Sequence, residues 1–271
     1  MEQNVKQKPA SKGGFKGIKN AFVVICICMV IAVIIFMTVF GNPANFAGGD
    51  SANKSINLLG TIFKGGFIVP IIHGMCLTVI VLVVERWLAL KTAFGKMSLY
   101  KFTDGIRKAM ATSDLAAAKA LCDKQGGTVA NVVAAALNRY EVEAADENKS
   151  KQAKLDAIKG ALEDATAVEM PVLQMNLPIL AVLTTLGVLT GLLGTVLGMI
   201  KSFSALSAGG GADSSALSEG ISEALVNTAS GIATSALAVI FYNFYTNKID
   251  KMTYTLDEVG FIIVQNFSTT H

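Results

Sequence analysis

The chain has 271 residues, of which 52% are hydrophobic and only 16% are charged, with a formal net charge of +3. A soluble domain usually carries roughly 25% charged residues. Here the charges are nearly absent from four long stretches and crowded between them. This uneven distribution indicates an integral membrane protein. No basic patch with interleaved aromatic residues is present, which argues against nucleic acid as a partner.

Four segments are apolar for long enough to cross a ~30 Å hydrocarbon core, which takes about 20 residues as a helix. They are residues 21–40, 67–84, 177–200 and about 221–245. The first follows a Lys-rich stretch, as the core of a secretory signal would. Its apolar run is longer than the usual ~7–15 residues and no clear A-x-A site follows, so we expect an uncleaved helix. Either interpretation leaves the following residues outside the cytoplasm.

Lys and Arg residues near the spans predict their direction. The N-terminal tail has five Lys, the segment 41–66 has two, and the loop from about 206 to 218 has none. Both termini are therefore expected in the cytoplasm. The predicted organisation is a cytoplasmic tail (1–20), transmembrane helices (21–40, 67–90, 177–203 and 219–246), outside loops (41–66 and 204–218), a cytoplasmic helical domain (91–176) and a cytoplasmic C-terminal tail (247–271). The outside loops, rich in Gly, Asn, Ser and Ala, are predicted to be flexible.

The large polar region is predicted to be helical. Gly126-Gly127 should break it, and Thr128 can cap the helix that follows. Residues 150–169 predict a charged helix, and Pro171 and Pro178 should bend or interrupt the chain near the membrane surface. With no strand pattern and no internal repeat, the expected fold is all-α: a polytopic membrane protein whose long helices extend into a cytoplasmic helical domain.

Span three carries a stripe of small residues. Four glycines lie within about 60° of one another at 100° per residue: Gly187, Gly191, Gly194 and Gly198. Such a face lets helix backbones approach closely where lipid removes the hydrophobic drive for association. Thr184 and Thr195 lie beside this stripe. Their hydroxyls can bond back to a helix carbonyl, face another helix or line a pore.

Span four carries a polar stripe within about 80° of arc, formed by Glu219, Glu223, Asn227, Ser230 and Thr234. A charge at mid-membrane costs about 2.5–3.5 kcal/mol on insertion scales, so such residues usually face a bundle interior or a wet cavity. Glu223 is expected roughly 15 Å into the helix, where it can hold or pass a proton; alternatively, it lies solvated and inert among the outer headgroups. Thr228 lies about 140° from Glu223, so the two cannot face the same point.

We expect this polar stripe to require shielding from lipid by other subunits. A single four-helix chain has few surfaces for that purpose, whereas a symmetric ring with spans three and four inside provides them directly. Three further polar sites lie at span ends. His73 is expected to be structural rather than a proton relay, Lys201 to reach the outer surface, and Glu85-Arg86 to anchor the inner interface.

The motifs of spans three and four resemble a known family. Residues 190–203, T-G-L-L-G-T-V-L-G-M-I-K-S-F, are similar to the G-L-L-G-T-V-x-G-[IM]-[IM]-x-[AS]-F signature of ExbB and TolQ proteins. Residues 221–233, I-S-E-A-L-V-N-T-A-S-G-I-A, and 238–245, A-V-I-F-Y-N-F-Y, resemble the family's last span. Glu85-Arg86 after span two also looks family-like. The chain thus resembles the MotA/TolQ/ExbB proton channel family, with ExbB as the best match.

The resemblance implies a homopentameric ring around two copies of a single-span ExbD/TolR-like protein, in the inner membrane, with membrane lipid and a TonB-like protein as further partners. It implies that proton flow is converted into work on a periplasm-spanning arm. Thr195 and Thr228 match the family's pore-lining threonines, and Glu223 matches its membrane glutamate. The family often has a Pro before G-L-L-G-T-V, which is absent here, and span one is additional to the common three-span plan.

Three functional hypotheses remain at this point. A proton-channel subunit energises either TonB-dependent outer-membrane transport or, as a TolQ-type subunit, the Tol-Pal envelope system. A passive membrane scaffold would need the glycines but not Glu223, Thr195 and Thr228. An enzyme is not expected, because the sequence shows no nucleophile–base set and no phosphate loop. Metal ions and cofactors are not expected either, since Cys26 and Cys28 form a C-x-C but no second cysteine pair or His cluster accompanies it.

Overall fold

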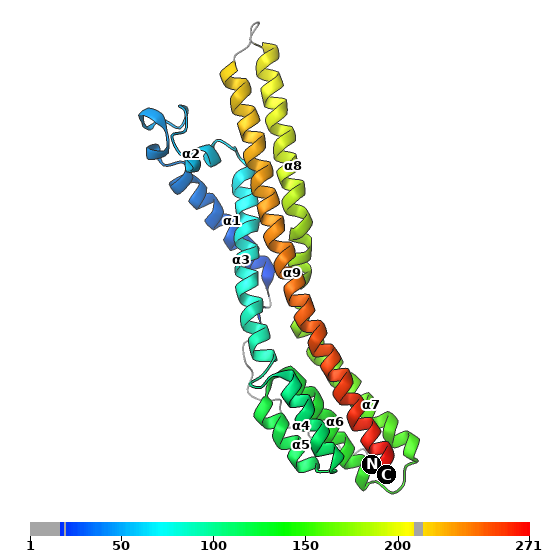
Figure 1. Ribbon diagram of the computed structural model, residues 1–271. Helices are drawn as coiled ribbons and strands as arrows, with labels where there is room; N and C mark the ends of the chain where they lie inside the picture. Colours follow the sequence, from blue (N-terminus) through cyan, green and yellow to red (C-terminus); the bar gives the residue numbers. More distant parts are fainter. Residues whose placement is uncertain (1–16, 19, 209–213) are drawn as a thin grey trace. The chain divides into compact units, whose positions relative to one another are not determined.

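The computed structural model describes residues 17–18, 20–208 and 214–271 (Figure 1). Most of them are helical, and the β interaction found among them is an isolated antiparallel bridge between Phe46 and Ser55. The predicted all-α fold is thus confirmed for this part of the chain. Two compact units form: a span unit, Ile18–Val84 with Asn176–Phe244, and a helical unit, Glu85–Met175 with Tyr245–His271 and Gly17.

Four helices in the described part are long and apolar enough to cross a membrane, which confirms the four predicted spans. They are α1 (Ala21–Ile35, continued by the π-helix η1, Phe36–Phe40), α3 (Ile68–Ala93), α8 (Leu177–Ala208) and α9 (Ser214–Thr270). The chain is therefore a multi-pass membrane protein. The two later helices run well beyond the apolar stretches that predicted them.

Helix α1 packs through one narrow face. Cys28, Ala32 and Phe36, spaced four residues apart, are buried, whereas most of its other large apolar side chains are exposed. On α3, a Cβ added at Gly74 would collide with Met29, so the two helices are in close contact there. Such a helix, apolar around its whole circumference, suits lipid on its remaining faces.

The segment between α1 and α3 is more ordered than its composition predicts. It contains η2 (Pro43–Asn45), η3 (Ala47–Gly49) and α2 (Leu58–Phe63). The Asn45 side chain donates hydrogen bonds to the carbonyls of Val39 and Phe40, at 2.7 and 2.9 Å, and accepts one from Asn57 at 2.9 Å. The prediction of a flexible loop is wrong here, because asparagine side chains form the hydrogen bonds that fix the backbone where regular secondary structure does not. The second predicted loop centres on residues 209–213, which lie outside the described residues.

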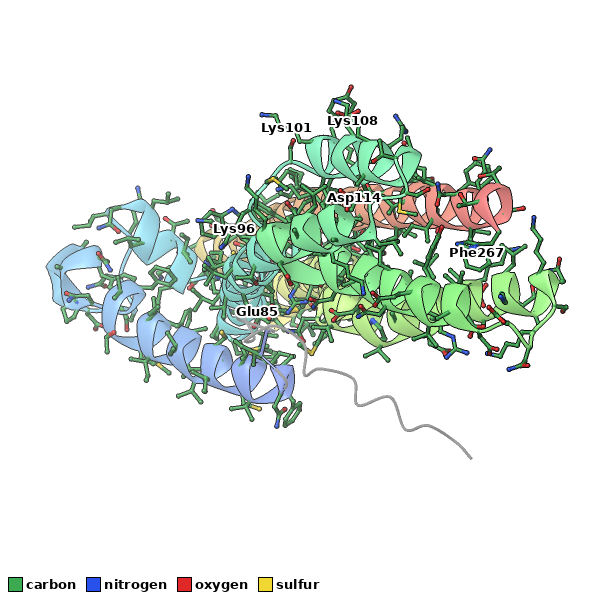
Figure 2. All side chains as sticks on the ribbon, turned by 90° about the horizontal axis from the view of Figure 1, so that it is seen from below. Glu85, Lys96, Lys101, Lys108, Asp114 and Phe267 are labelled. Carbon is green, nitrogen blue, oxygen red and sulfur yellow. The ribbon has the colours of Figure 1, made fainter. Side chains whose placement is uncertain are left out.

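The helical unit consists of α4 (Leu99–Ala111), α5 (Leu115–Gln125), α6 (Gly127–Ala145), α7 (Lys151–Gln174) and parts of α3 and α9. Helix α4 shows the amphipathic logic of the unit. Phe102, Ile106 and Met110 are buried, while Lys101 and Lys108 point outward (Figure 2). The helical unit thus carries the exposed charged side chains that the spans lack.

The C-terminal part of α9 is a core element of the helical unit. Its buried residues recur at helical spacing and are Met252, Leu256, Val259, Ile263 and Phe267. The Phe267 ring packs edge-on against Tyr140 of α6 at 4.8 Å, and the Tyr140 hydroxyl donates to Asn266 at 2.8 Å. The prediction that residues 247–271 form only a tail is therefore wrong, since their apolar stripe is what the α4–α7 helices cover.

Two helix boundaries also differ from expectation. Gly126, with φ 61°, is itself the N-cap of α6, so Thr128 lies inside the helix and its hydroxyl donates to Glu169 at 3.1 Å instead of capping. Pro171 lies within α7, and the interruption comes at Asn176, whose φ is 66°. Pro178 follows in the first turn of α8, where a missing N–H costs nothing.

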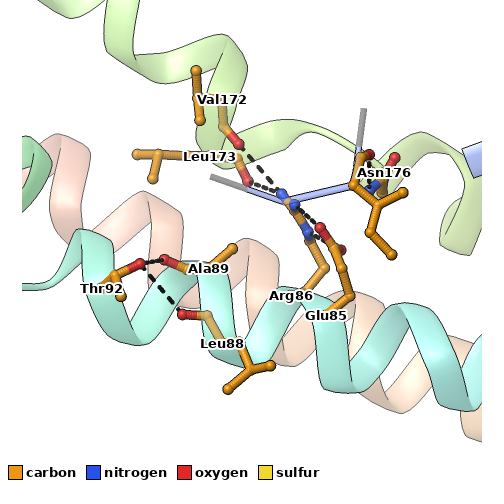
Figure 3. A network of polar contacts seen from close by, with 9 residues as sticks. Glu85, Arg86, Leu88, Ala89, Thr92, Val172, Leu173 and Asn176 are labelled. Atoms are coloured by element: carbon orange, nitrogen blue, oxygen red, sulfur yellow. Dashed lines mark hydrogen bonds and ion pairs between the residues drawn. The ribbon is translucent and has the colours of Figure 1, made fainter. Parts of the chain in front are cut away.

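Glu85 and Arg86 form a buried ion pair in the helical unit (Figure 3). The Arg86 side chain is fully buried and that of Glu85 is 3% exposed, with Nε donating to the carboxylate at 2.6 Å. Arg86 Nη1 also donates to the carbonyls of Val172 and Leu173, both at 3.3 Å. These carbonyls belong to the last turn of α7, where backbone acceptors lack helical partners. Arg86 thus caps the C-terminal end of α7 from a buried position, and its predicted place at the inner membrane interface stays a prediction.

Replacing Arg86 by Met should destabilise the helical unit by ~3–5 kcal/mol, because it withdraws the counter-charge from a buried carboxylate. The chain's one tryptophan, Trp87, is the adjacent residue and reports unfolding by fluorescence. Arg107→Met is the matched control, since its ion pair with Glu258 is half exposed and should matter far less. Equal denaturation midpoints for both variants would contradict the capping role.

Cys122 should be chemically silent in the folded protein. Burial raises the pKa of its thiol to about 12, and the Asp123 carboxylate raises it in the same direction. Below that pH the thiol stays protonated, and only the thiolate is nucleophilic. We expect no maleimide labelling of the Cys122 peptide at about pH 8 before denaturation and full labelling after it, by mass spectrometry. Rapid labelling of the native protein would show that the α5 packing is wrong.

Candidate functional site

The glycine face of α8 lies directly against α9 within the span unit (Figure 1). A Cβ added at Gly198 would lie 2.7 Å from the carbonyl oxygen of Gly220, and one at Gly191 would lie 3.0 Å from that of Asn227. The first distance is shorter than real Cβ atoms show, and the second is tighter than most of their contacts. All four glycines of the predicted stripe contact α9 in this way: Gly187, Gly191, Gly194 and Gly198. The two backbones therefore approach as closely as small residues allow.

Glu223 is buried near the start of α9 and paired with a lysine of α8. Its side chain is 11% exposed, and Lys201 Nζ donates to its Oε2 at 2.9 Å. Roughly one helical turn earlier on α9, Glu219 accepts from Lys64 at 3.3 Å. Neither acid of the predicted stripe is isolated, and Lys201 is a partner of Glu223 rather than a free surface charge.

The turn after α2 closes the other side of this cluster. Gly66 has a φ of 76°, a conformation that favours glycine, and an added Cβ would collide with the Glu223 carboxylate. Asn227, fully buried one turn further along α9, donates from Nδ2 to the Gly65 carbonyl at 2.9 Å. Its Oδ1 has no hydrogen-bond partner among the described residues.

These contacts overturn one argument from the sequence. Glu223, Asn227 and Thr234 are buried by their own chain, with whole-residue exposed fractions of 9%, 0% and 2%. Most of the polar stripe is therefore shielded without neighbouring copies, whereas the Glu219 side chain remains 43% exposed. The sequence did not reveal this burial, because Gly65 and Gly66 belong to a loop whose folded path cannot be predicted from its composition.

Thr195 and Thr228 form a second, separate polar pair. Their hydroxyls are in direct hydrogen-bond contact across the α8–α9 boundary, and both side chains are half-buried. Each hydroxyl also lies within reach of a carbonyl of its own helix, Thr195 of Gly191 at 3.2 Å and Thr228 of Ala224 at 3.1 Å. Because a hydroxyl carries one proton, one threonine donates to the other while the second donates back to its own helix. The structure thus brings two of the three predicted site residues together and gives Glu223 other neighbours, in keeping with their ~140° separation on α9.

An open groove of about 810 Å³ runs along α8 beside Thr195. Its lining is mostly apolar and includes three hydroxyl side chains. The lining residues are Thr195, Val196, Met199, Ile200, Phe203, Ser204 and Ser207. By contrast, the hydroxyl of Thr184 only bonds back to Ala181, at 2.6 Å. His73 contacts its own helix through Nδ1 at 2.9 Å from the Val69 carbonyl and packs against Phe40. Within the described ranges, no group of three His, Cys, Asp or Glu side chains is placed to hold a metal.

Residues 125–258 match the family model described as the MotA/TolQ/ExbB proton channel family, and this segment contains α8, most of α9 and the residues of both polar clusters that these two helices carry. The chain belongs to the MotA/TolQ/ExbB proton channel family. Members of this family are channel or motor subunits rather than enzymes, which confirms the expectation that this chain is not an enzyme. The match begins after α4, so the family-like reading of Glu85-Arg86 stays a prediction.

Individual relatives include both ExbB-like and TolQ proteins. The chain is 40% identical over 87 residues to a putative biopolymer transport protein ExbB-like 3 of Synechocystis, covering 31% of this chain and 41% of the relative. It is 37% identical over 93 residues to Helicobacter pylori ExbB, covering 34% and 63%. It is 32% identical over 100 residues to Pseudomonas aeruginosa TolQ, covering 37% and 43%. The similarity thus spans less than two-thirds of each relative's length, from 41% to 63%.

The close approach of α8 and α9 gives a direct test. Gly194→Leu places a large side chain against Asn227 and should force the helices apart, lowering the melting temperature and the yield of purified protein. Gly160→Leu is the control, because that glycine lies in α7 with no atom near its missing Cβ. It should be neutral or slightly stabilising, since glycine is a poor helix former by about 1 kcal/mol. A normal melting temperature for Gly194→Leu would rule out the packing described.

Proposed function

We propose that this chain is the channel-forming subunit of an inner-membrane motor that uses the proton motive force to energise TonB-dependent outer-membrane transport. The Thr195–Thr228 pair beside an open apolar groove carries the proposal. Hydroxyls donate and accept without carrying charge, so they can hold water or a partner's carboxyl group at a pore wall. Family membership supports proton conduction as the use of such a pair.

The partner in this proposal is an ExbD/TolR-like protein with a single span. The groove along α8 is apolar enough for a membrane helix, and hydroxyls at Thr195, Ser204 and Ser207 offer polar contacts within its lining. We propose five copies of this chain around two copies of that partner, with a TonB-like protein receiving the work. The support for a ring is the exposed apolar and hydroxyl face of α8, and no longer the polar stripe of α9.

The membrane orientation is also part of the proposal. The Lys-rich N-terminal tail and the charges of α4–α7 favour the cytoplasmic side for both termini and for the helical unit. Glu223, Glu219 and their lysines then lie toward the periplasmic side. The proposed domain boundaries follow the sequence assignment, except that residues 247–270 belong to the helical unit through α9.

A TolQ-type role in the Tol-Pal system is the second candidate, favoured by the 32% identity to the Pseudomonas TolQ. The neighbouring genes separate the two: a TonB-like gene beside an ExbD-like one supports transport, whereas Pal and a TolB-like propeller support the Tol system. A passive scaffold, the third candidate, has no use for the Thr195–Thr228 contact. It would tolerate loss of either hydroxyl.

We expect Thr228→Val and Glu223→Ala to leave assembly with the partner intact and to abolish energisation. Valine keeps the shape of threonine but removes the hydroxyl that contacts Thr195, and alanine removes the buried carboxylate. The measurement is growth under a TonB- or Tol-dependent condition, with native mass spectrometry of the purified complex. Thr184→Val is the control and should grow normally, because that hydroxyl only bonds its own helix. Full growth of both test variants would rule out a proton pathway through these residues.

A further inference from the structure

The Glu223 carboxylate is contacted from two sides inside the span unit. Lys201 reaches it from α8, and the Gly66 turn packs against it. Glu219, one turn away on the same helix, pairs with Lys64 instead. The charged groups on these elements are Lys201, Lys64, Glu219 and Glu223, since α8 and the span part of α9 carry no others. Two acids therefore face two bases, and the cluster is balanced in charge.

The two ion pairs are built in opposite ways. In the pair of Lys64 with Glu219, the lysine is the more buried partner, at 17% exposure against 43%. In the pair of Lys201 with Glu223, the acid is buried at 11% while the lysine is 57% exposed. The flexible lysine stem thus comes from the open side of α8 to a fixed acid. A carboxylate that is mostly withdrawn from solvent depends strongly on such a partner, because its desolvation is not otherwise compensated.

We propose that Lys201 is a positioning residue for Glu223, which sets the orientation of the carboxylate by a charge-assisted hydrogen bond to Oε2. This inference rests on the proposed role of Glu223 in proton-driven work. Gly66 blocks one side of the carboxylate and leaves the Lys201 side as its polar contact. Without the ammonium group, the acid keeps its place on α9 but loses the donor that fixes its Oε2.

The test uses the full chain assembled with its partner, and the readout is growth that depends on energisation. Lys201→Met keeps most of the stem and removes the charge, and should lower activity on the order of tenfold. Lys201→Arg keeps the charge and the donor, and should restore most of the activity. Lys64→Met removes the neighbouring pair, whose acid Glu219 is 43% exposed and depends less on a counter-charge, and should change activity little. If Lys201→Met fails to assemble by native mass spectrometry, Lys201→Gln takes its place.

A charge exchange gives the sharpest result. Lys201→Glu and Glu223→Lys should each abolish activity and lower the melting temperature. The double variant should recover the melting temperature, since the pair is reformed with its ends exchanged, but stay inactive, since no carboxylate remains at position 223; activity in the double variant would overturn the inference. Glu223→Gln separates the two proposals. If it is fully active, the role proposed for Glu223 fails. If it is inactive while Lys201→Met matches the wild type, only the Lys201 inference is overturned. Equal loss in Lys201→Met and Lys201→Arg would overturn it as well.

Discussion

Ionisable groups in an apolar helix need partners, and this constraint organises the span unit. The acids of α9 would be costly in a bilayer if they were left alone. Each one is matched by a lysine from another element, and the buried Asn227 is tied to the turn after α2. Those contacts require α8 and α9 to lie backbone against backbone, which the glycine face permits. The pairing of the polar side chains and the close packing of α8 against α9 thus occur together in the span unit.

The helical unit meets the same constraint with a different device. Arg86 is withdrawn from water completely, yet all of its described contacts are acceptors: the Glu85 carboxylate and two carbonyls at the end of α7. An arginine suits this place because its planar fork supplies several donors at fixed angles. The helix end that Asn176 terminates would otherwise leave those carbonyls without donors in a dry environment.

The sequence predicted the spans, the all-α fold, the glycine face and the family, because each is encoded locally by length, spacing or motif. It did not predict the partners of Glu223, since Lys201 and Gly66 are brought to it only by tertiary structure. The helical angle between Thr228 and Glu223 correctly predicted that they face different neighbours, but the sequence could not show which helix each one faces. Residues 247–271 were predicted to be a tail because charged residues separate their apolar positions. Only the packing against Tyr140 shows that this apolar stripe is buried.

The π-helical end of α1 affects how this chain fits its bilayer. A transmembrane helix normally has to bring its last carbonyls up to the headgroups, where water can bond them. Here the Asn45 amide supplies donors to the carbonyls of Val39 and Phe40 from the protein itself. The C-terminal end of α1 therefore has two of its last carbonyls satisfied by the protein itself. These two acceptors do not depend on water or lipid headgroups for a donor.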